Sequence, residues 1–266
     1  MAPYFRIFGF TVQAYGLLIL AAVWTGLEVA SRRARRLGLN SNQVYNLVFY
    51  ALVATVLGAR LVYVIMHWSA YRGALLSALS LTPTALSWPE GALIGGVVAI
   101  IYWSRRRLPV GATLDALAPG LVIALALERL GAFLDGRDFG EPTTMPWGVY
   151  LWDAVRHPVQ LYEMIALLVI FGMLWWQEER ERFDPFQIRL VPFRGYIFAI
   201  FVALYAGSRL VLEAFYANAS LLPGGIRTAQ VVALVVLLGA VWYLYRRRFA
   251  ASKEPVTEAA GKVQPH

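Results

Sequence analysis

The chain has 266 residues, of which 59% are hydrophobic, and its mean hydropathy of +0.57 excludes an ordinary soluble domain. It has no cysteine, which excludes disulfides, thiolate metal sites and a cysteine nucleophile. A net charge of +8 would suggest nucleic acid as a partner for a soluble protein, but here the positions of the charges decide what they mean.

Apolar segments separated by polar residues predict seven membrane-spanning helices. In chain order they are Val12–Ala30, Val44–Met66, Glu90–Trp103, Ala112–Phe133, Pro158–Trp176, Gly195–Phe215 and Thr228–Tyr245. The third is short for the roughly 20 residues that a span needs, and Pro89 can begin it. The weakly apolar Ala74–Leu86 is expected to form a separate interfacial or re-entrant helix. The predicted fold class is therefore all-α, a polytopic membrane protein with a single seven-helix domain over residues 1–250.

Basic residues follow every odd-numbered span. The segments are SRRARR, SRRRL, EERERFDPFQIRLVPFR and RRRF. The positive-inside rule then predicts an N-terminus outside and a C-terminus in the cytoplasm. The basic excess is therefore explained by topology and does not indicate nucleic acid. The polar tail, residues 251–266, is expected to be disordered, residues 1–11 lack the pattern of a cleavable signal peptide, and the oligomeric state is left open.

Ionisable residues inside the spans are functional candidates, because each costs about 2.5–3.5 kcal/mol at a helix centre. The predicted topology places Arg129, Arg209, Glu163 and Glu213 in one layer near the outer headgroups. Two arginines at this depth can clamp a phosphate through planar, bidentate donation, and the carboxylates can hold those arginines in place. The pattern fits either a site for a phospholipid headgroup or a structural ion-pair network, and we favour the site.

Three further charges lie within spans. Glu28 and Asp115 lie near the inner ends of their helices and are expected to snorkel to the interface. Arg60 is expected either to pair with a carboxylate and join two helices, or to contribute to substrate binding.

Polar residues and glycines in the predicted outer loops extend the candidate site. They come from the segments RHPVQLYEM and DGRDFG. A lone histidine is usually structural, but His157 stands beside an arginine at the same interface. Glycines permit tight backbone close to a ligand. The candidates are Asp135, Gly136, Gly140, Arg156, His157, Gln160 and Tyr162.

The segment ERLGAFLDGRDFG resembles the signature Gly-Arg-Leu-Gly-Asn-Phe-x-Asn-Gly-Glu-x-x-Gly of the prolipoprotein diacylglyceryl transferases, a family of bacterial membrane enzymes. RHPVQLYE resembles the family motif Arg-His-Pro-Ser-Gln-Leu-Tyr-Glu. Weaker matches in QAYGLLIL, LGARLVYV and YAGSRLVLEAF follow the family order, from about Tyr15 to Phe215. The family also has seven spans with the N-terminus outside.

The resemblance implies a reaction in the bacterial inner membrane. A diacylglyceryl group moves from phosphatidylglycerol to the lipobox cysteine thiol of a prolipoprotein signal peptide, and glycerol phosphate leaves. The attacking cysteine belongs to the substrate, and no cofactor or metal is implied. The functional residues of the family fall on Tyr15, Arg129, Gly140, Tyr205, Arg209 and Glu213, with Tyr15 and the two arginines as catalytic candidates.

The chain departs from the family pattern at several positions. The replacements are Glu90 for a histidine often proposed as the base, Ala132 and Asp135 for two asparagines, and Arg137 for a glutamate. Asp138 and Glu141 are the nearby carboxylates that can replace that glutamate. The departures leave open a related transferase with another acceptor or headgroup, or an impaired or substrate-shifted paralogue that binds phospholipid headgroups without transferase activity. A transporter is not favoured, because the charges cluster near one face only.

The base that ionises the substrate thiol has three alternatives. A free cysteine has a pKa of about 8.5 and is mostly protonated at neutral pH. Glu90 occupies the family's histidine position, and a glutamate can serve there only if burial raises its pKa. His157 has the more suitable chemistry. The third alternative is no protein base, with Arg129 and Arg209 lowering the pKa of the thiol by their positive charge.

Overall fold

The computed structural model describes residues 4–7, 10–73, 75–79, 85–183 and 193–252. They fall into two compact units, which are described separately. The large unit is Met1–Ala30 with Leu114–His266, and the small unit is Ser31–Thr113. The single seven-helix domain expected over residues 1–250 stays a prediction, and most of the tail lies outside the described residues.

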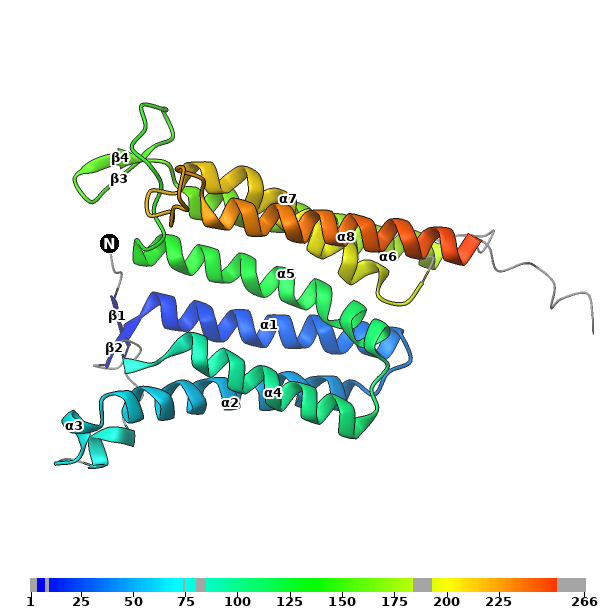
Figure 1. Ribbon diagram of the computed structural model, residues 1–266, viewed down its shortest axis with the longest axis horizontal. Helices are drawn as coiled ribbons and strands as arrows, with labels where there is room; N and C mark the ends of the chain where they lie inside the picture. Colours follow the sequence, from blue (N-terminus) through cyan, green and yellow to red (C-terminus); the bar gives the residue numbers. More distant parts are fainter. Residues whose placement is uncertain (1–3, 8–9, 74, 80–84, 184–192, 253–266) are drawn as a thin grey trace, which may run out of the picture. The chain divides into compact units, whose positions relative to one another are not determined.

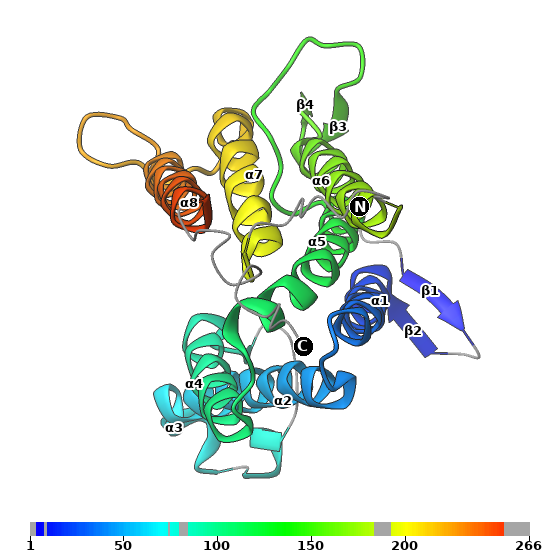
Figure 2. The same ribbon diagram turned by 90° about the vertical axis from the view of Figure 1, so that its right-hand side faces the viewer.

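The large unit consists mainly of long apolar helices. They are α1 (Ala14–Arg36) and α5 (Val110–Asp135), which both continue into the small unit, and α6 (Val159–Phe183), α7 (Tyr196–Leu212) and α8 (Thr228–Ser252). The 3-10 helix η3 (Glu213–Phe215) continues α7. Figures 1 and 2 show α5, α6, α7 and α8 running side by side. The hydrophobic core between α5, α6 and α7 contains Ala118, Val122, Ala126, Leu167, Ile170, Leu174, Ile197 and Phe201.

A glycine pair brings α1 and α5 into backbone contact. A Cβ atom on Gly120 would lie 2.3 Å from the carbonyl oxygen of Gly26, so a larger residue would push the helices apart. Gly131, one helix turn before the end of α5, lets the ring of Tyr15 pack closely, because a Cβ there would lie 3.0 Å from Tyr15 Cδ2. These contacts place the start of α1 beside the end of α5.

The expectation that the carboxylate of Asp115 snorkels to the interface is wrong. It is buried, and its side chain accepts hydrogen bonds from the backbone N–H groups of Gly195 at 2.6 Å and Phe198 at 3.0 Å. A carboxylate at this position satisfies donors that the first turn of α7 cannot pair itself. Asp115 therefore joins the start of α7 to α5.

The small unit contains α2 (Ser41–Met66), α3 (Trp68–Tyr71), the 3-10 helix η1 (Leu75–Leu79) and α4 (Trp88–Arg106). α2 and α4 pack through small residues, since a Cβ on Gly91 would lie 2.5 Å from the carbonyl oxygen of Thr55. Of the helix expected over Ala74–Leu86, residues 75–79 form η1, while residues 74 and 80–84 lie outside the described residues.

Arg60 pairs with backbone carbonyls rather than with the carboxylate expected from the sequence. Its buried guanidinium donates to the carbonyl oxygens of Ser77 at 2.7 Å, Ala78 at 2.8 Å and Ala85 at 2.9 Å. Backbone carbonyl oxygens can satisfy a buried arginine as well as an acid does. Arg60 therefore anchors η1 and Ala85 to α2.

Six helices in the described part of the chain are long and apolar enough to cross a membrane. They are Ala14–Arg36, Ser41–Met66, Val110–Asp135, Val159–Gln177, Tyr196–Phe215 and Thr228–Arg248. Each predicted span lies mainly on one of the α-helices described above, although the first begins in β2 (Phe10–Gln13) and the sixth ends in η3. The short third span lies on α4, which is not among the six, so a membrane crossing by α4 stays a prediction. Many large apolar side chains on these helices are exposed, as contact with lipid requires.

Two short antiparallel hairpins depart from the all-α expectation. β1 (Tyr4–Ile7) pairs with β2 (Phe10–Gln13), and β3 (Val149–Leu151) pairs with β4 (Ala154–Arg156). The turn between β3 and β4 has positive φ at both Trp152 and Asp153, as a two-residue primed turn needs. Figure 1 shows β3 and β4 beyond the end of α5 in the large unit.

Candidate functional site

Glu163 on α6 joins the two arginines that the sequence nominates. Its Oε1 accepts from Arg209 Nη1 at 2.6 Å, and its Oε2 accepts from Arg129 Nη1 at 3.2 Å. Glu163 is buried, whereas the two arginines, called the clamp arginines below, keep a fifth to a quarter of their side-chain surface exposed. One carboxylate therefore sets the spacing of two guanidinium groups from α5 and α7.

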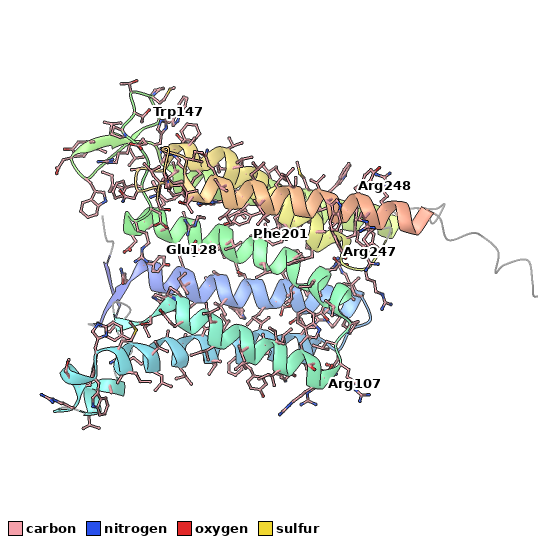
Figure 3. All side chains as sticks on the ribbon, viewed as in Figure 1. Arg107, Glu128, Trp147, Phe201, Arg247 and Arg248 are labelled. Atoms are coloured by element: carbon pink, nitrogen blue, oxygen red, sulfur yellow. The ribbon has the colours of Figure 1, made fainter. Side chains whose placement is uncertain are left out.

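Each clamp arginine has further carboxylate partners. Arg129 Nε lies 2.5 Å from Glu128 Oε2, and Arg129 Nη1 lies 3.1 Å from Asp138 Oδ2. Arg209 pairs with Glu213, four residues later on the same helix face. The cluster thus holds four carboxylates around two arginines. Figure 3 shows Glu128 towards the end of the large unit that carries Trp147, while Arg247 and Arg248 lie at the opposite end of α8.

Tyr216 completes the coordination of Glu163 and was not nominated from the sequence. Its hydroxyl donates to Glu163 Oε2 at 2.6 Å, and the guanidinium of Arg209 lies over its ring, 4.9 Å from the ring centre. Burial and the negative charge of Glu163 raise the pKa of the Tyr216 hydroxyl above its usual value of 10, so the hydroxyl remains a hydrogen-bond donor at neutral pH. Tyr216 follows η3 with an extended backbone, so no helical spacing in the sequence indicated its contact with Glu163.

The outer-loop candidates build the loop that follows α5. Buried Gln160 donates from Nε2 to the carbonyl oxygen of Arg137 at 2.6 Å. Arg156 donates to the carbonyl oxygens of Leu151 at 3.1 Å and Gly140 at 3.3 Å. Gly136 has a φ of 74°, which glycine adopts without strain. These side chains and this backbone position shape the loop over the clamp arginines.

Gly140 lies where three segments meet. It pairs with Tyr216 as an isolated β-bridge, and Pro142 pairs with Arg156 of β4. A Cβ on Gly140 would lie 2.5 Å from the carbonyl oxygen of His157 and 2.9 Å from that of Phe215. Only glycine fits between these backbones, so Gly140 ties the loop to the segment that carries Tyr216.

Arg227 holds this segment from the other side and was also missed by the sequence analysis. Its Nη1 donates to the carbonyl oxygens of Glu213 at 2.8 Å and Tyr216 at 2.5 Å, and its Nη2 lies 3.4 Å from Glu141 Oε1. Of the two carboxylates proposed to replace the family's glutamate, Asp138 therefore contacts a clamp arginine and Glu141 contacts Arg227.

Arg137, at a position where the chain departs from the family, stacks on Tyr15. Its guanidinium carbon lies 3.9 Å from the centre of the Tyr15 ring, and its Nε donates to Asp135 Oδ2 at 2.7 Å. Gln13 donates to the other oxygen of Asp135 at 2.7 Å, and the Tyr15 hydroxyl lies 3.5 Å from Glu128 Oε1. Tyr15 thus stands between the loop and the carboxylate that holds Arg129.

His157 faces aromatic neighbours. Its Nδ1 lies 3.1 Å from the hydroxyl of Tyr162, which also accepts from Trp147 Nε1 at 2.7 Å. The ring of Phe215 packs edge-on against the imidazole, with ring centres 5.1 Å apart. A role as base requires substrate to approach the same ring.

Glu90 belongs to the small unit. It lies half-buried in the first turn of α4, after Pro89, where the helix dipole favours a negative charge. That position alone accounts for an acidic residue here. Its proposed role as base stays a prediction.

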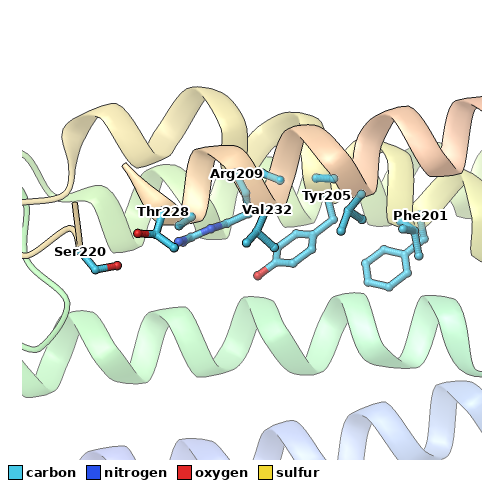
Figure 4. Close-up of a pocket in the computed structure, with 11 residues that line it drawn as sticks. Phe201, Tyr205, Arg209, Ser220, Thr228 and Val232 are labelled. Atoms are coloured by element: carbon cyan, nitrogen blue, oxygen red, sulfur yellow. The ribbon is translucent and has the colours of Figure 1, made fainter. Parts of the chain in front are cut away.

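An apolar pocket of about 430 Å³ lies between α7 and α8. Arg209, Ser220 and Thr228 supply polar groups toward one end, and Phe201 lies toward the other (Figure 4). Tyr205, a further candidate from the sequence, lines the pocket between them, beside Val232. The pocket therefore runs from a clamp arginine along an apolar helix interface.

The chain matches the model of the family described as prolipoprotein diacylglyceryl transferase over residues 3–246. It is 30% identical over 256 residues to the phosphatidylglycerol–prolipoprotein diacylglyceryl transferase of Thermosynechococcus vestitus, an alignment that covers 92% of each chain. It is 32% identical over 259 residues to the protein of the same name from Synechocystis sp.. That alignment covers 91% of this chain and 89% of the Synechocystis protein. The same name belongs to a Mycobacteroides abscessus protein 30% identical over 259 residues, covering 88% of this chain and 73% of the relative.

Proposed function

This chain belongs to the prolipoprotein diacylglyceryl transferase family, and on that premise we propose that it transfers a diacylglyceryl group from phosphatidylglycerol to the lipobox cysteine thiol of prolipoproteins. The observation that carries the proposal is the pair of clamp arginines joined by Glu163 at the end of an apolar pocket. A phospholipid has this same combination of an anionic headgroup and apolar chains.

The clamp arginines are proposed to bind the phosphate. Guanidinium groups donate two parallel hydrogen bonds to phosphate oxygens, and these donors are fixed before the lipid arrives because Glu163, Glu213 and Glu128 already orient them. Arg209 also lines the pocket, so a phosphate on its guanidinium would leave an acyl chain free to follow α7 toward Phe201. The pocket is therefore proposed to hold one acyl chain of the lipid.

In the proposed reaction the substrate thiolate attacks the glycerol carbon that carries the phosphate ester. A carbon–sulfur bond forms, the carbon–oxygen bond breaks, and the electron pair leaves with glycerol phosphate. The negative charge that develops on the leaving phosphate is stabilised by Arg129 and Arg209, which is the step that fixed cations accelerate. Tyr205 is proposed to contact the lipid in the pocket that it lines, and Tyr15, beside Glu128, is proposed to act in catalysis next to Arg129.

Three routes are proposed by which the substrate thiol loses its proton. Glu90 and His157 are the candidate bases, and the third alternative is direct ionisation of a thiol beside the clamp arginines. The hydrogen bond of His157 with Tyr162 supports a defined orientation of the imidazole. The loop that contains Gly140 and Gln160 is proposed to shape the entrance through which the peptide reaches the lipid.

We further propose that the protein crosses the bacterial inner membrane seven times, with its N-terminus outside. The basic residues at the C-terminal end of α8 and the aromatic hairpin at the other end of the large unit support this orientation. The clamp arginines then lie near the outer leaflet, where the signal peptide of an exported prolipoprotein arrives. α4, which carries the third predicted span, is proposed to cross the membrane as well and so to complete the seven crossings, in spite of its shorter apolar stretch.

The test is a direct product assay. Purified protein is incubated with phosphatidylglycerol and a lipobox peptide, and the thioether product is sought by mass spectrometry. A peptide with serine in place of cysteine is the control, because it offers no thiol. Lipid binding without thioether product would favour a paralogue that binds phospholipid headgroups and lacks transferase activity.

A further inference from the structure

We propose that Asp138 is a displaceable anion, which occupies Arg129 while the site is empty and competes with the lipid phosphate for that arginine. This inference rests on the proposed function, because it assigns a role to a residue at the same phosphate site. Asp138 would thereby set the affinity for the lipid and hasten the release of glycerol phosphate.

The four carboxylates of the cluster are held to different degrees. The side chains of Glu163 and Glu213 are 2% and 6% exposed, and that of Glu128 is 21% exposed. Asp138 is 45% exposed, and its contact with Arg129 Nη1 at 3.1 Å is its one ion pair in the described structure. The carboxylate that returns to water at the smallest cost is therefore Asp138.

The backbone holds Asp138 at the entrance while leaving its side chain free to turn. Its φ is 54°, a left-handed conformation that aspartate and asparagine tolerate better than most residues. Gly136 and Gly140 flank it, and Gln160 holds the preceding carbonyl at 2.6 Å. A rotation about χ1 can move the carboxylate away from Arg129 without moving this loop.

Charge balance requires one carboxylate to yield when phosphate binds. Four carboxylates already surround two arginines, and Arg129 Nη1 is shared between Asp138 and Glu163. A phosphate on the same nitrogen adds negative charge, and repulsion is relieved most easily at the exposed carboxylate, which water can solvate. When glycerol phosphate forms, the return of Asp138 to Arg129 opposes its retention.

The test compares Asp138→Asn with Asp153→Asn. Asparagine keeps the left-handed backbone and the size of the side chain while removing the charge. Asp153 is the matched control, because it is also an exposed aspartate with a positive φ, 60°, but it lies in the turn between β3 and β4 and is not one of the four carboxylates around the clamp arginines. Two quantities are measured: KM for phosphatidylglycerol in the transfer assay, and the affinity for glycerol phosphate by calorimetry without turnover.

Asp138→Asn should lower KM and tighten glycerol phosphate binding by about three- to fivefold, the size expected for an exposed ion pair. Asp153→Asn should change neither. Unchanged or weaker glycerol phosphate binding by Asp138→Asn, in a protein with wild-type thermal stability, would overturn the inference. If the wild-type protein binds glycerol phosphate but forms no thioether, the proposed function fails while the calorimetric comparison still tests Asp138.

Discussion

Replacement of Glu163 by glutamine tests whether one buried carboxylate sets the geometry of the site. Glu163 accepts from Arg129, Arg209 and Tyr216, and a neutral amide of the same shape can accept at only one of its two terminal atoms. Loss of one partner from a buried ion pair costs about 3–5 kcal/mol. Because each clamp arginine keeps another carboxylate, we expect a loss of about 3 kcal/mol in the free energy of unfolding, the low end of that range.

The effect on activity follows from positioning. A displacement of about 1 Å in a binding group can lower a rate by roughly 100-fold, so kcat/KM of Glu163→Gln should fall by about that factor. The assays are initial rates of thioether formation and thermal unfolding in detergent, with Asp153→Asn as the exposed control. Tyr216→Phe, which removes one of the three hydrogen bonds to Glu163, should give a smaller loss in the same direction. A Glu163→Gln protein with wild-type kcat/KM would refute the reasoning.

Two further predictions concern the base and the topology. If Glu90 is the base, Glu90→Gln should lower the rate strongly while Glu90→His retains activity, and if His157 is the base, His157→Gln should lower the rate strongly instead. A near-wild-type rate in both Gln variants would point to the clamp arginines alone. Single-cysteine variants at Arg72 and Arg106 should react differently with a membrane-impermeant thiol reagent in intact cells. Labelling is expected at position 72, and labelling at position 106 instead would reverse the topology.

The positions of the helices could be predicted because long apolar runs leave few alternatives for backbone hydrogen bonds in a membrane. The charged layer could be predicted for the same reason, since charges within such runs need partners. The partners themselves were less predictable. Arg60 donates to backbone carbonyl oxygens, and Asp115 accepts from backbone N–H groups at the start of α7. Backbone groups that lie elsewhere in the sequence can satisfy a buried charge as well as an acid or base does.

The β3–β4 hairpin was missed because three-residue strands carry almost no periodic signal. Its turn has Trp152 and Asp153 at positive φ, where Asn-Gly or Asp-Gly would have been recognisable. Tyr216 was missed because it follows the sixth predicted span and carries no charge at neutral pH. Its role depends on contact with Glu163, which lies 53 residues away in the chain.

The central claim is that Arg129 and Arg209 hold the lipid phosphate together, and kcat/KM of the two single alanine variants and the double variant tests it most directly. Each single variant should lose about 100- to 1000-fold, and the double variant little more than the worse single one, because the arginines act as a unit through Glu163. Lysine substitutions should restore only part of the activity, since bidentate donation is lost. Arg247→Ala, at the opposite end of α8, is the control and should retain activity. Near-wild-type turnover in both single alanine variants, at normal levels of membrane-inserted protein, would contradict the account.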